Sequence, residues 1–209
     1  MAFTRNGYGQ VEPNQLSAQK TGQIYASLPL ASDVDILQNG EFMYYDYKSG
    51  TVTADGKGEP MLVFNEVKLY EPFWQTSYKD FAMIRVGDNY VTSRLATAGY
   101  GDGAETEGVT PNPGHSDWQA GYRMDGIAPR LFKTNVGDIF TTNMVETGNE
   151  ITYNQGDTLK LKKVSKAPDK TGNTLVLSKT GDIDALEFVV AKVYTMPDGQ
   201  QGLKLQRIK

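Results

Sequence analysis

Residues 158–164 read TLKLKKV, and residues 203–208 read LKLQRI. In each run two leucines alternate with lysine or another polar residue. Because successive side chains of a β-strand point to opposite faces of its sheet, this alternation predicts strands with one buried face and one wet face. Strands of that kind are typical of antiparallel sheets.

Turn signals stand beside these runs and beside others like them. Residues 136–138 read VGD, 155–157 QGD, 180–182 TGD and 197–199 PDG. Glycine accepts a positive φ, and aspartate bonds nearby backbone amides, so such triplets favour tight turns. We therefore expect residues 128–209 to form one small antiparallel barrel or sandwich. Its expected strands cover residues 139–145, 158–164, 175–177, 186–194 and 203–208.

An earlier stretch, residues 39–47, reads NGEFMYYDY. Alternation puts Phe42 and Tyr44 on one face of this predicted strand and Met43, Tyr45 and Tyr47 on the other. A strand with aromatic residues on both faces is either central in a sandwich or covered by a partner. We assign it to a first β unit, residues 31–98. Within that unit, residues 77–86 fit either a capped helix or a strand.

Two regions lack this pattern. Residues 1–30 are polar, and their apolar residues show no sustained helical or strand period, so we expect an extended N-terminal arm. That arm either packs on its own domain or is held by a neighbouring chain. Residues 99–127 hold many glycines and prolines and few aliphatic residues, which predicts a long loop between the units. The predicted fold is all-β, with two small antiparallel sandwich or barrel units and the arm.

Composition argues against several functions. The 209 residues contain no cysteine and one histidine, His115, so the chain has little equipment for catalysis or for metal binding. The net charge of −4 argues against nucleic acid as the main partner. The lysines at 160, 162, 163 and 166 are interpreted as a solvated strand face. Apolar stretches are only a few residues long, and residues 1–15 lack a secretory signal, which argues against a membrane segment and against export.

The remaining chemical motifs have simpler interpretations. His115, Ser116 and Asp117 are consecutive, and consecutive residues cannot form a hydrolytic triad unaided. The acidic residues at 102, 105 and 107 lack the alternation of a calcium loop, so we expect a solvated acidic loop. We expect no enzyme activity, no cofactor and no metal, although a hydrolase built on an Asp/Glu pair is a further alternative.

The aromatic residues Tyr70, Phe73, Trp74 and Tyr78 lie close together in the sequence. With the tyrosines of residues 39–47 they fit three roles: core, protein interface, or a stacking platform for sugars. In the last role Trp74, Tyr70 and Phe73 are the expected glycan-binding residues.

Three stretches together resemble the structural proteins of tailed bacteriophage particles, of the capsid-decoration or minor-capsid type. They are residues 1–10, MAFTRNGYGQ, residues 38–46, QNGEFMYYD, and residues 135–143, NVGDIFTTN. The resemblance implies a cysteine-poor, β-rich, non-enzymatic protein that is ordered partly by its neighbours. Its location would be the virion, after assembly in the host cytoplasm.

On this basis we expect a protein that binds and stabilises or decorates the capsid lattice. Its expected partners are the major capsid protein, other virion proteins and further copies of the chain. Phe3, Arg5, Tyr8 and Tyr25 are the expected capsid-contact residues. The alternative function is a β-sandwich glycan-binding module of a tail or receptor-binding assembly.

Overall fold

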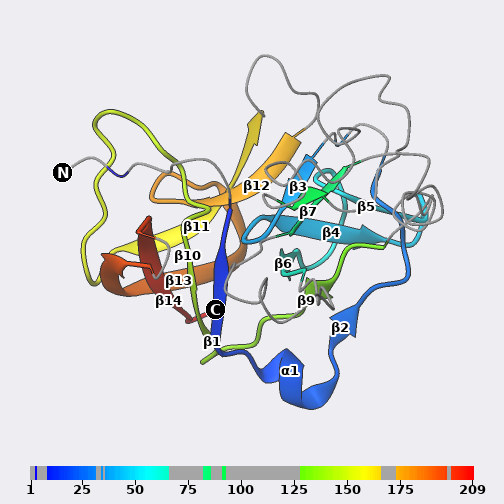
Figure 1. Cartoon of the computed structure of the whole chain (residues 1–209), viewed down its shortest axis with the longest axis horizontal. Coiled ribbons are helices and arrows are strands. Elements are labelled where there is room, and N and C mark those ends of the chain that lie inside the picture. The colour runs from blue at the N-terminus through cyan, green and yellow to red at the C-terminus, as the bar shows by residue number, and fades with distance from the viewer. Residues whose placement is uncertain are drawn as a thin grey trace, which may run out of the picture.

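The fold is all-β and antiparallel, as the alternating runs predicted (Figure 1). The computed structural model describes residues 3, 9–31, 34, 36–65, 128–165, 173–196 and 199–209, and the backbone of residues 82–85 and 91–92. These residues contain strands and one short helix, α1 (Ser17–Thr21). All pairings between the named strands are antiparallel.

Most strands belong to one curled sheet, a half-barrel. In order of pairing they are β1 (Val11–Gln15), β10 (Ile139–Thr142), β14 (Gln201–Arg207), β13 (Ile183–Thr195), β11 (Thr158–Ser165), β12 (Asn173–Ser178), β4 (Phe42–Asp46), β6 (Met61–Val63), β9 (Leu131–Phe132) and β2 (Ile24–Tyr25). A further strand, β5 (Thr51–Thr53), pairs with β4. A smaller sheet consists of β3 (Ile36–Gln38), β7 (Ala82–Arg85) and β8 (Val91–Thr92). Residues 77–86 were predicted to be either a capped helix or a strand, and the strand is confirmed for the part that forms β7.

The two predicted β units share this sheet. Leu175 of β12 pairs with Phe42 of β4, and Leu62 of β6 pairs with Phe132 of β9. Strands from residues 31–98 thus lie between strands from residues 128–209. The sequence analysis assigned these strands to two units, and alternation shows that a strand is buried on one face but not which strands pair.

Two of the Gly-Asp signals form the same turn. In residues 135–138 and 154–157 the aspartate N–H donates to the asparagine carbonyl, at 3.0 and 3.1 Å. The aspartate carboxylate in return accepts the asparagine N–H, at 2.8 and 2.7 Å. The glycines have φ of 94° and 90°, and their N–H groups donate to Arg207 of β14 and Val190 of β13, both at 2.8 Å. The interpretation of these triplets as turns is confirmed, and each turn is also fastened to a neighbouring strand.

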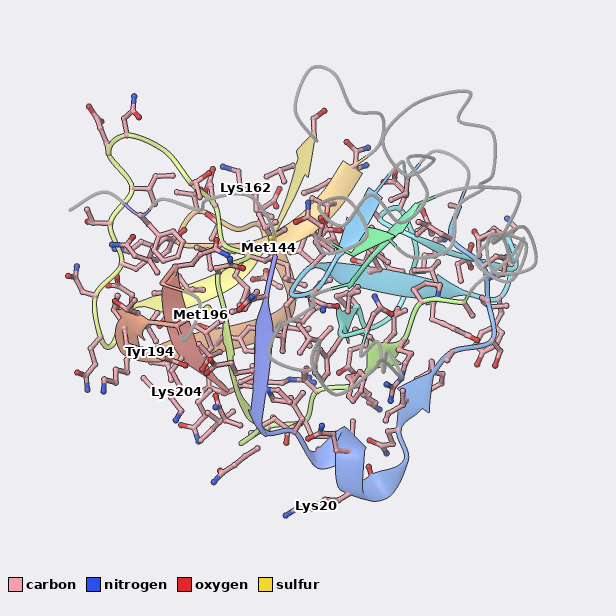
Figure 2. All side chains as sticks on the ribbon, in the orientation of Figure 1. Lys20, Met144, Lys162, Tyr194, Met196 and Lys204 are labelled. Atoms are coloured by element: carbon pink, nitrogen blue, oxygen red, sulfur yellow. The ribbon has the colours of Figure 1, made fainter. Side chains whose placement is uncertain are left out.

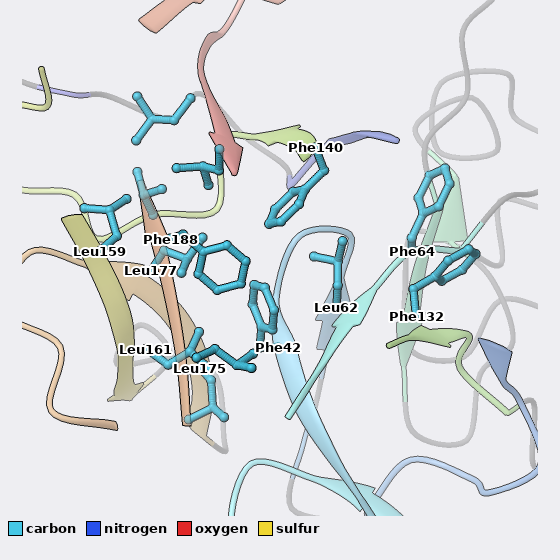
Figure 3. Packing of buried hydrophobic residues seen from close by; sticks show 14 of the residues in the cluster. Phe42, Leu62, Phe64, Phe132, Phe140, Leu159, Leu161, Leu175, Leu177 and Phe188 are labelled. Carbon is cyan, nitrogen blue, oxygen red and sulfur yellow. The ribbon is translucent and has the colours of Figure 1, made fainter. Parts of the chain in front are cut away.

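The core has two clusters, one on each face of β4. In the first cluster the rings of Phe42, Phe140 and Phe188 meet from three strands, with centroids 5.6 to 6.2 Å apart (Figure 3). The second cluster, on the opposite face, includes Met43 of β4 and packs against Tyr45. It consists of Ala31, Val34, Leu37, Met43, Val52, Ala54, Met61, Val63 and Leu131. Since both faces are covered within the chain, β4 is the central strand that its aromatic pattern allowed.

Both edges of the main sheet come from the N-terminal part of the chain. β1 is one edge and β2 is the other, and only residues 16–23 connect them. Ten strands laid flat would separate the edges by about 43 Å, at about 4.8 Å per pair. The connection spans at most about 32 Å when fully extended, and its helix shortens it further. The sheet must therefore curl, and Figure 1 shows the chain passing from β1 through α1 to β2.

Within residues 1–30, the described residues 9–25 lie against the rest of their own chain, which is one of the two alternatives left open for the arm. Residues 9–25, which we call the closing segment, pair with β10 and β9 of their own chain. Leu16 and Ala18 are buried in the first cluster. The segment changes from strand to helix to strand within 15 residues, so no single period runs through its apolar positions.

Replacing Phe188 with alanine should lower the free energy of unfolding by about 3–5 kcal/mol, because it opens a cavity where three aromatic rings meet. Urea unfolding followed by fluorescence measures the change. Ile208→Ala, at a position that is 45% exposed, is the control and should cost about 0.5 kcal/mol or less. Equal losses in the two variants would contradict the proposed role of the ring cluster.

Candidate functional site

Three tyrosines form a row that leads from the core to the surface. Tyr25 lies on β2, Tyr45 on β4, and Tyr47 directly after β4. The ring centroids are 5.3 Å apart for Tyr25 and Tyr45 and 5.2 Å apart for Tyr45 and Tyr47. Tyr25 and Tyr45 are half-buried against the second cluster, whereas Tyr47 is 75% exposed. We call these residues the tyrosine row.

Hydrogen bonds of side chains hold the row in place. The Tyr45 hydroxyl accepts the N–H of Ser27 at 3.1 Å. After Tyr47 the chain turns, and the Asp46 carboxylate accepts the Ser49 hydroxyl at 2.7 Å and the Lys48 N–H at 3.1 Å. These bonds, that of the Ser49 hydroxyl first, lower the pKa of Asp46. Tyr47 is therefore presented on an ordered turn, which reduces the entropy lost when it is covered by a partner.

The rings are tilted relative to one another. The interplanar angle is 56° between Tyr25 and Tyr45 and 73° between Tyr45 and Tyr47. A sugar stacks on a flat ring face, and this row offers a ridge of ring edges and faces instead of one plane. Tyrosine is enriched at protein interfaces because its ring is apolar and its hydroxyl still bonds to polar groups. The geometry suits contact with a protein surface better than a flat sugar platform.

The predicted capsid-contact residues have different positions. Phe3 is 3% exposed and packs edge-on against Tyr153 at 5.5 Å, and its N–H donates to Ile151. Its ring therefore lies buried in the first cluster of its own chain. Tyr25 belongs to the tyrosine row. Arg5 and Tyr8 lie outside the described residues.

The predicted glycan-binding residues, Trp74, Tyr70 and Phe73, also lie outside the described residues, as do Tyr78, His115 and the acidic loop at 102–107. Tyr44 is buried in the first cluster, so its ring faces away from the tyrosine row. The two aromatic faces of β4 are therefore separated by the strand itself, as its alternation predicted.

A second polar site escaped the sequence analysis. Glu146 accepts hydrogen bonds from Lys162 at 2.5 Å, from Thr180 at 3.3 Å, and from Ser178 (Lys162 is labelled in Figure 2). Burial raises the pKa of Glu146, but the bonds from Lys162 and Ser178 outweigh it and hold that pKa below its usual value. Ser178 is fully buried, so the cluster ties strands together and does not present a reactive hydroxyl.

The lysines of β11 have carboxylate partners. Lys160 pairs with Asp184 at 2.6 Å, Lys162 with Glu146, and Lys163 with Asp55. These pairs are compatible with the predicted solvated strand face, since Lys160 and Lys163 are more than a third exposed. No sequence signal marks the pairing, because each partner lies at least 16 residues away and is brought in by the fold.

Within the described residues, no cluster of three or more histidine, cysteine, aspartate or glutamate side chains is placed to hold a metal ion. In the same part of the chain, no helix has the length and apolar character needed to cross a membrane. No protein-family model, curated protein or solved structure matches the chain. The residues and their geometry are therefore the basis for the proposal below.

The Glu146 cluster predicts a stability loss in acid. Because the folded-state pKa of Glu146 is lowered, its contribution is present above the unfolded-state pKa and is lost as the pH falls through the folded-state value. Glu146→Gln should therefore lower stability at neutral pH and weaken the pH dependence below about pH 4.5. Urea midpoints between pH 3 and pH 7 measure this, with the exposed Glu150→Gln as control. An unchanged pH profile in Glu146→Gln would contradict the assignment.

Proposed function

We propose that the chain is a non-enzymatic structural protein of a tailed-bacteriophage particle that binds the capsid lattice through its tyrosine row. The observation that carries the proposal is the exposed ring of Tyr47 at the end of an ordered aromatic row. The choice of a phage particle rests on the sequence resemblance of residues 1–10, 38–46 and 135–143 to phage structural proteins.

Several properties of the row support a role in protein contact. A ring that is 75% exposed in the free chain has apolar area to bury, and burial of apolar area drives association. Tyr45 packs against this ring on one side, and Tyr25 in turn packs against Tyr45. Hot spots of binding are enriched in tyrosine and are surrounded by contacts of this kind.

The partner in this proposal is the major capsid protein, with other virion proteins and further copies of the chain as neighbours. Assembly takes place in the host cytoplasm, and the mature location is the virion. The Phe3 ring has no part in the capsid contact. Arg5 and Tyr8 keep their expected role in this proposal, and Tyr25 acts as part of the row.

Tyr47→Ala should weaken binding to capsids by about tenfold or more, because truncation of an interface tyrosine commonly costs more than 1 kcal/mol. The assay is co-sedimentation of the purified chain with capsids assembled from the major capsid protein of the phage that encodes it. Tyr47→Phe retains the ring and should keep most of the binding. Thermal unfolding checks that both variants are folded.

Removal of residues 1–25 is a poor test, since it deletes both edge strands and the buried Leu16 and Ala18. The point variant leaves these intact. Wild-type binding by a folded Tyr47→Ala would overturn the role of the tyrosine row. Absence of any co-sedimentation by the wild-type chain would overturn the proposed function itself.

A glycan-binding module is the second candidate, and the same exposed ring favours it because a lone tyrosine can stack on a sugar. In that case Trp74, Tyr70 and Phe73 would contribute further rings. A glycan array separates the two candidates. Saturable binding to a defined glycan that is lost in Trp74→Ala would favour the module, and absence of array binding together with capsid binding would favour the capsid protein.

A further inference from the structure

We propose that the pair Asn39-Gly40 is a latent modification site, at which Asn39 loses its side-chain amide as ammonia once the surrounding fold opens. In the closed fold the reaction is blocked. After the reaction the turn does not return to its native structure. This inference does not depend on the capsid role, because it concerns the chemistry of one turn.

The reaction is a cyclisation followed by hydrolysis. The backbone nitrogen of Gly40 loses its proton, and its electron pair forms a bond to Cγ of Asn39. The bond from Cγ to Nδ2 breaks, and the amide nitrogen leaves as ammonia with the proton that Gly40 gave up. Water then adds to either carbonyl of the five-membered ring, and the C–N bond at that carbonyl breaks. The product is aspartate or isoaspartate at position 39.

The turn between β3 and β4 depends on both residues of this pair. Gly40 has a φ of 92°, a conformation that strains residues with a side chain. A Cβ at this position would also overlap Thr142 and come within 2.9 Å of Met144, which is labelled in Figure 2. Glycine has no side chain to obstruct the attack on Cγ, so it is also the residue that makes the preceding asparagine reactive. The fold therefore retains a reactive pair.

The groups that take part in the cyclisation are hydrogen-bonded in the closed fold. The N–H of Gly40 donates to the carbonyl of Val63 at 2.9 Å. The side-chain oxygen of Asn39 accepts the N–H of Asn65 at 2.7 Å, and Nδ2 of Asn39 donates to the carbonyl of Asn65 at 3.2 Å. We call the two bonds between Asn39 and Asn65 the asparagine clasp. Cyclisation breaks these bonds, because it removes the Gly40 proton and Nδ2 and turns Cγ toward Gly40.

The asparagine clasp is also buried. Asn39 is 5% exposed and Asn65 is 3% exposed. The side-chain oxygen of Asn65 accepts the N–H of Arg130 at 2.8 Å, which ties the clasp to the chain just before β9. The site opens only when the end of β6 separates from the turn before β4. That separation is a local unfolding event, and its free-energy cost sets how often the site is reactive.

Neither product fits the closed site. Aspartate replaces the donor Nδ2 with a carboxylate oxygen that faces the carbonyl of Asn65, and an acceptor buried in this way without a donor is costly. Isoaspartate adds one carbon to the main chain, which displaces Gly40 from its bond to Val63. The asparagine clasp therefore does not close again after the reaction.

Mass spectrometry of the full chain tests the block. The chain is incubated at mildly alkaline pH with and without guanidinium chloride and is then cut with trypsin, which places Asn39 in the peptide 21–48. Deamidation of Asn39 should be at least about tenfold slower without denaturant, because only the open form reacts. The other Asn-Gly pair of the sequence, Asn6-Gly7, is the reference in denaturant and should react there at a similar rate.

Equal rates for Asn39 with and without denaturant would overturn the block. Absence of reaction at Asn39 in denaturant, where Asn6 reacts, would overturn the assignment of the site.

Refolding tests whether the change is one-way. After partial deamidation in guanidinium chloride the chain is refolded, and the folded monomer is separated from the remainder by size exclusion. The peptide 21–48 from the folded monomer should contain several-fold less of the deamidated form than the same peptide from the whole sample. Equal contents would overturn the one-way character of the reaction.

A variant isolates the effect of the product. Asn39→Asp introduces the same carboxylate without incubation, and Asn149→Asp, at an exposed position, is the control with the same change in charge. Asn39→Asp should unfold at a lower denaturant concentration than the wild-type chain or fail to fold, whereas Asn149→Asp should keep the wild-type midpoint. A wild-type midpoint in Asn39→Asp would overturn the role of the asparagine clasp.

Discussion

The fold depends on the joining of the two edges of the main sheet by residues 16–23. On one side of this connection β1 pairs with β10, and on the other side β2 pairs with β9. Between them, at α1, there is no strand pairing. At α1 the contact is made by the Asp138 carboxylate, which accepts hydrogen bonds from Ser17 and from the N–H of Asn135. A connection too short for a flat sheet forces the curl, and the curl brings Phe42, Phe140 and Phe188 together.

The tyrosine row follows from the same constraint. β4 is buried on both faces, so its aromatic residues have to divide between two clusters, and the tyrosine at position 47 falls just beyond the covered part of the strand. Tyr25 reaches Tyr45 because β2 is held at its place by β9. The position of the candidate site is thus set by the same strand pairing and burial that form the core. It lies where the second cluster meets solvent.

Local physical rules explain which parts of this structure could be predicted. Alternation at 158–164 and 203–208 and the Gly-Asp turns at 135–138 and 154–157 depend on neighbouring residues alone, and both predictions are confirmed. Alternation also placed Tyr45 and Tyr47 on one face. The pairing of β12 with β4, the burial of Phe3 and the bonds to Glu146 depend on residues distant in sequence. No local pattern encodes those contacts.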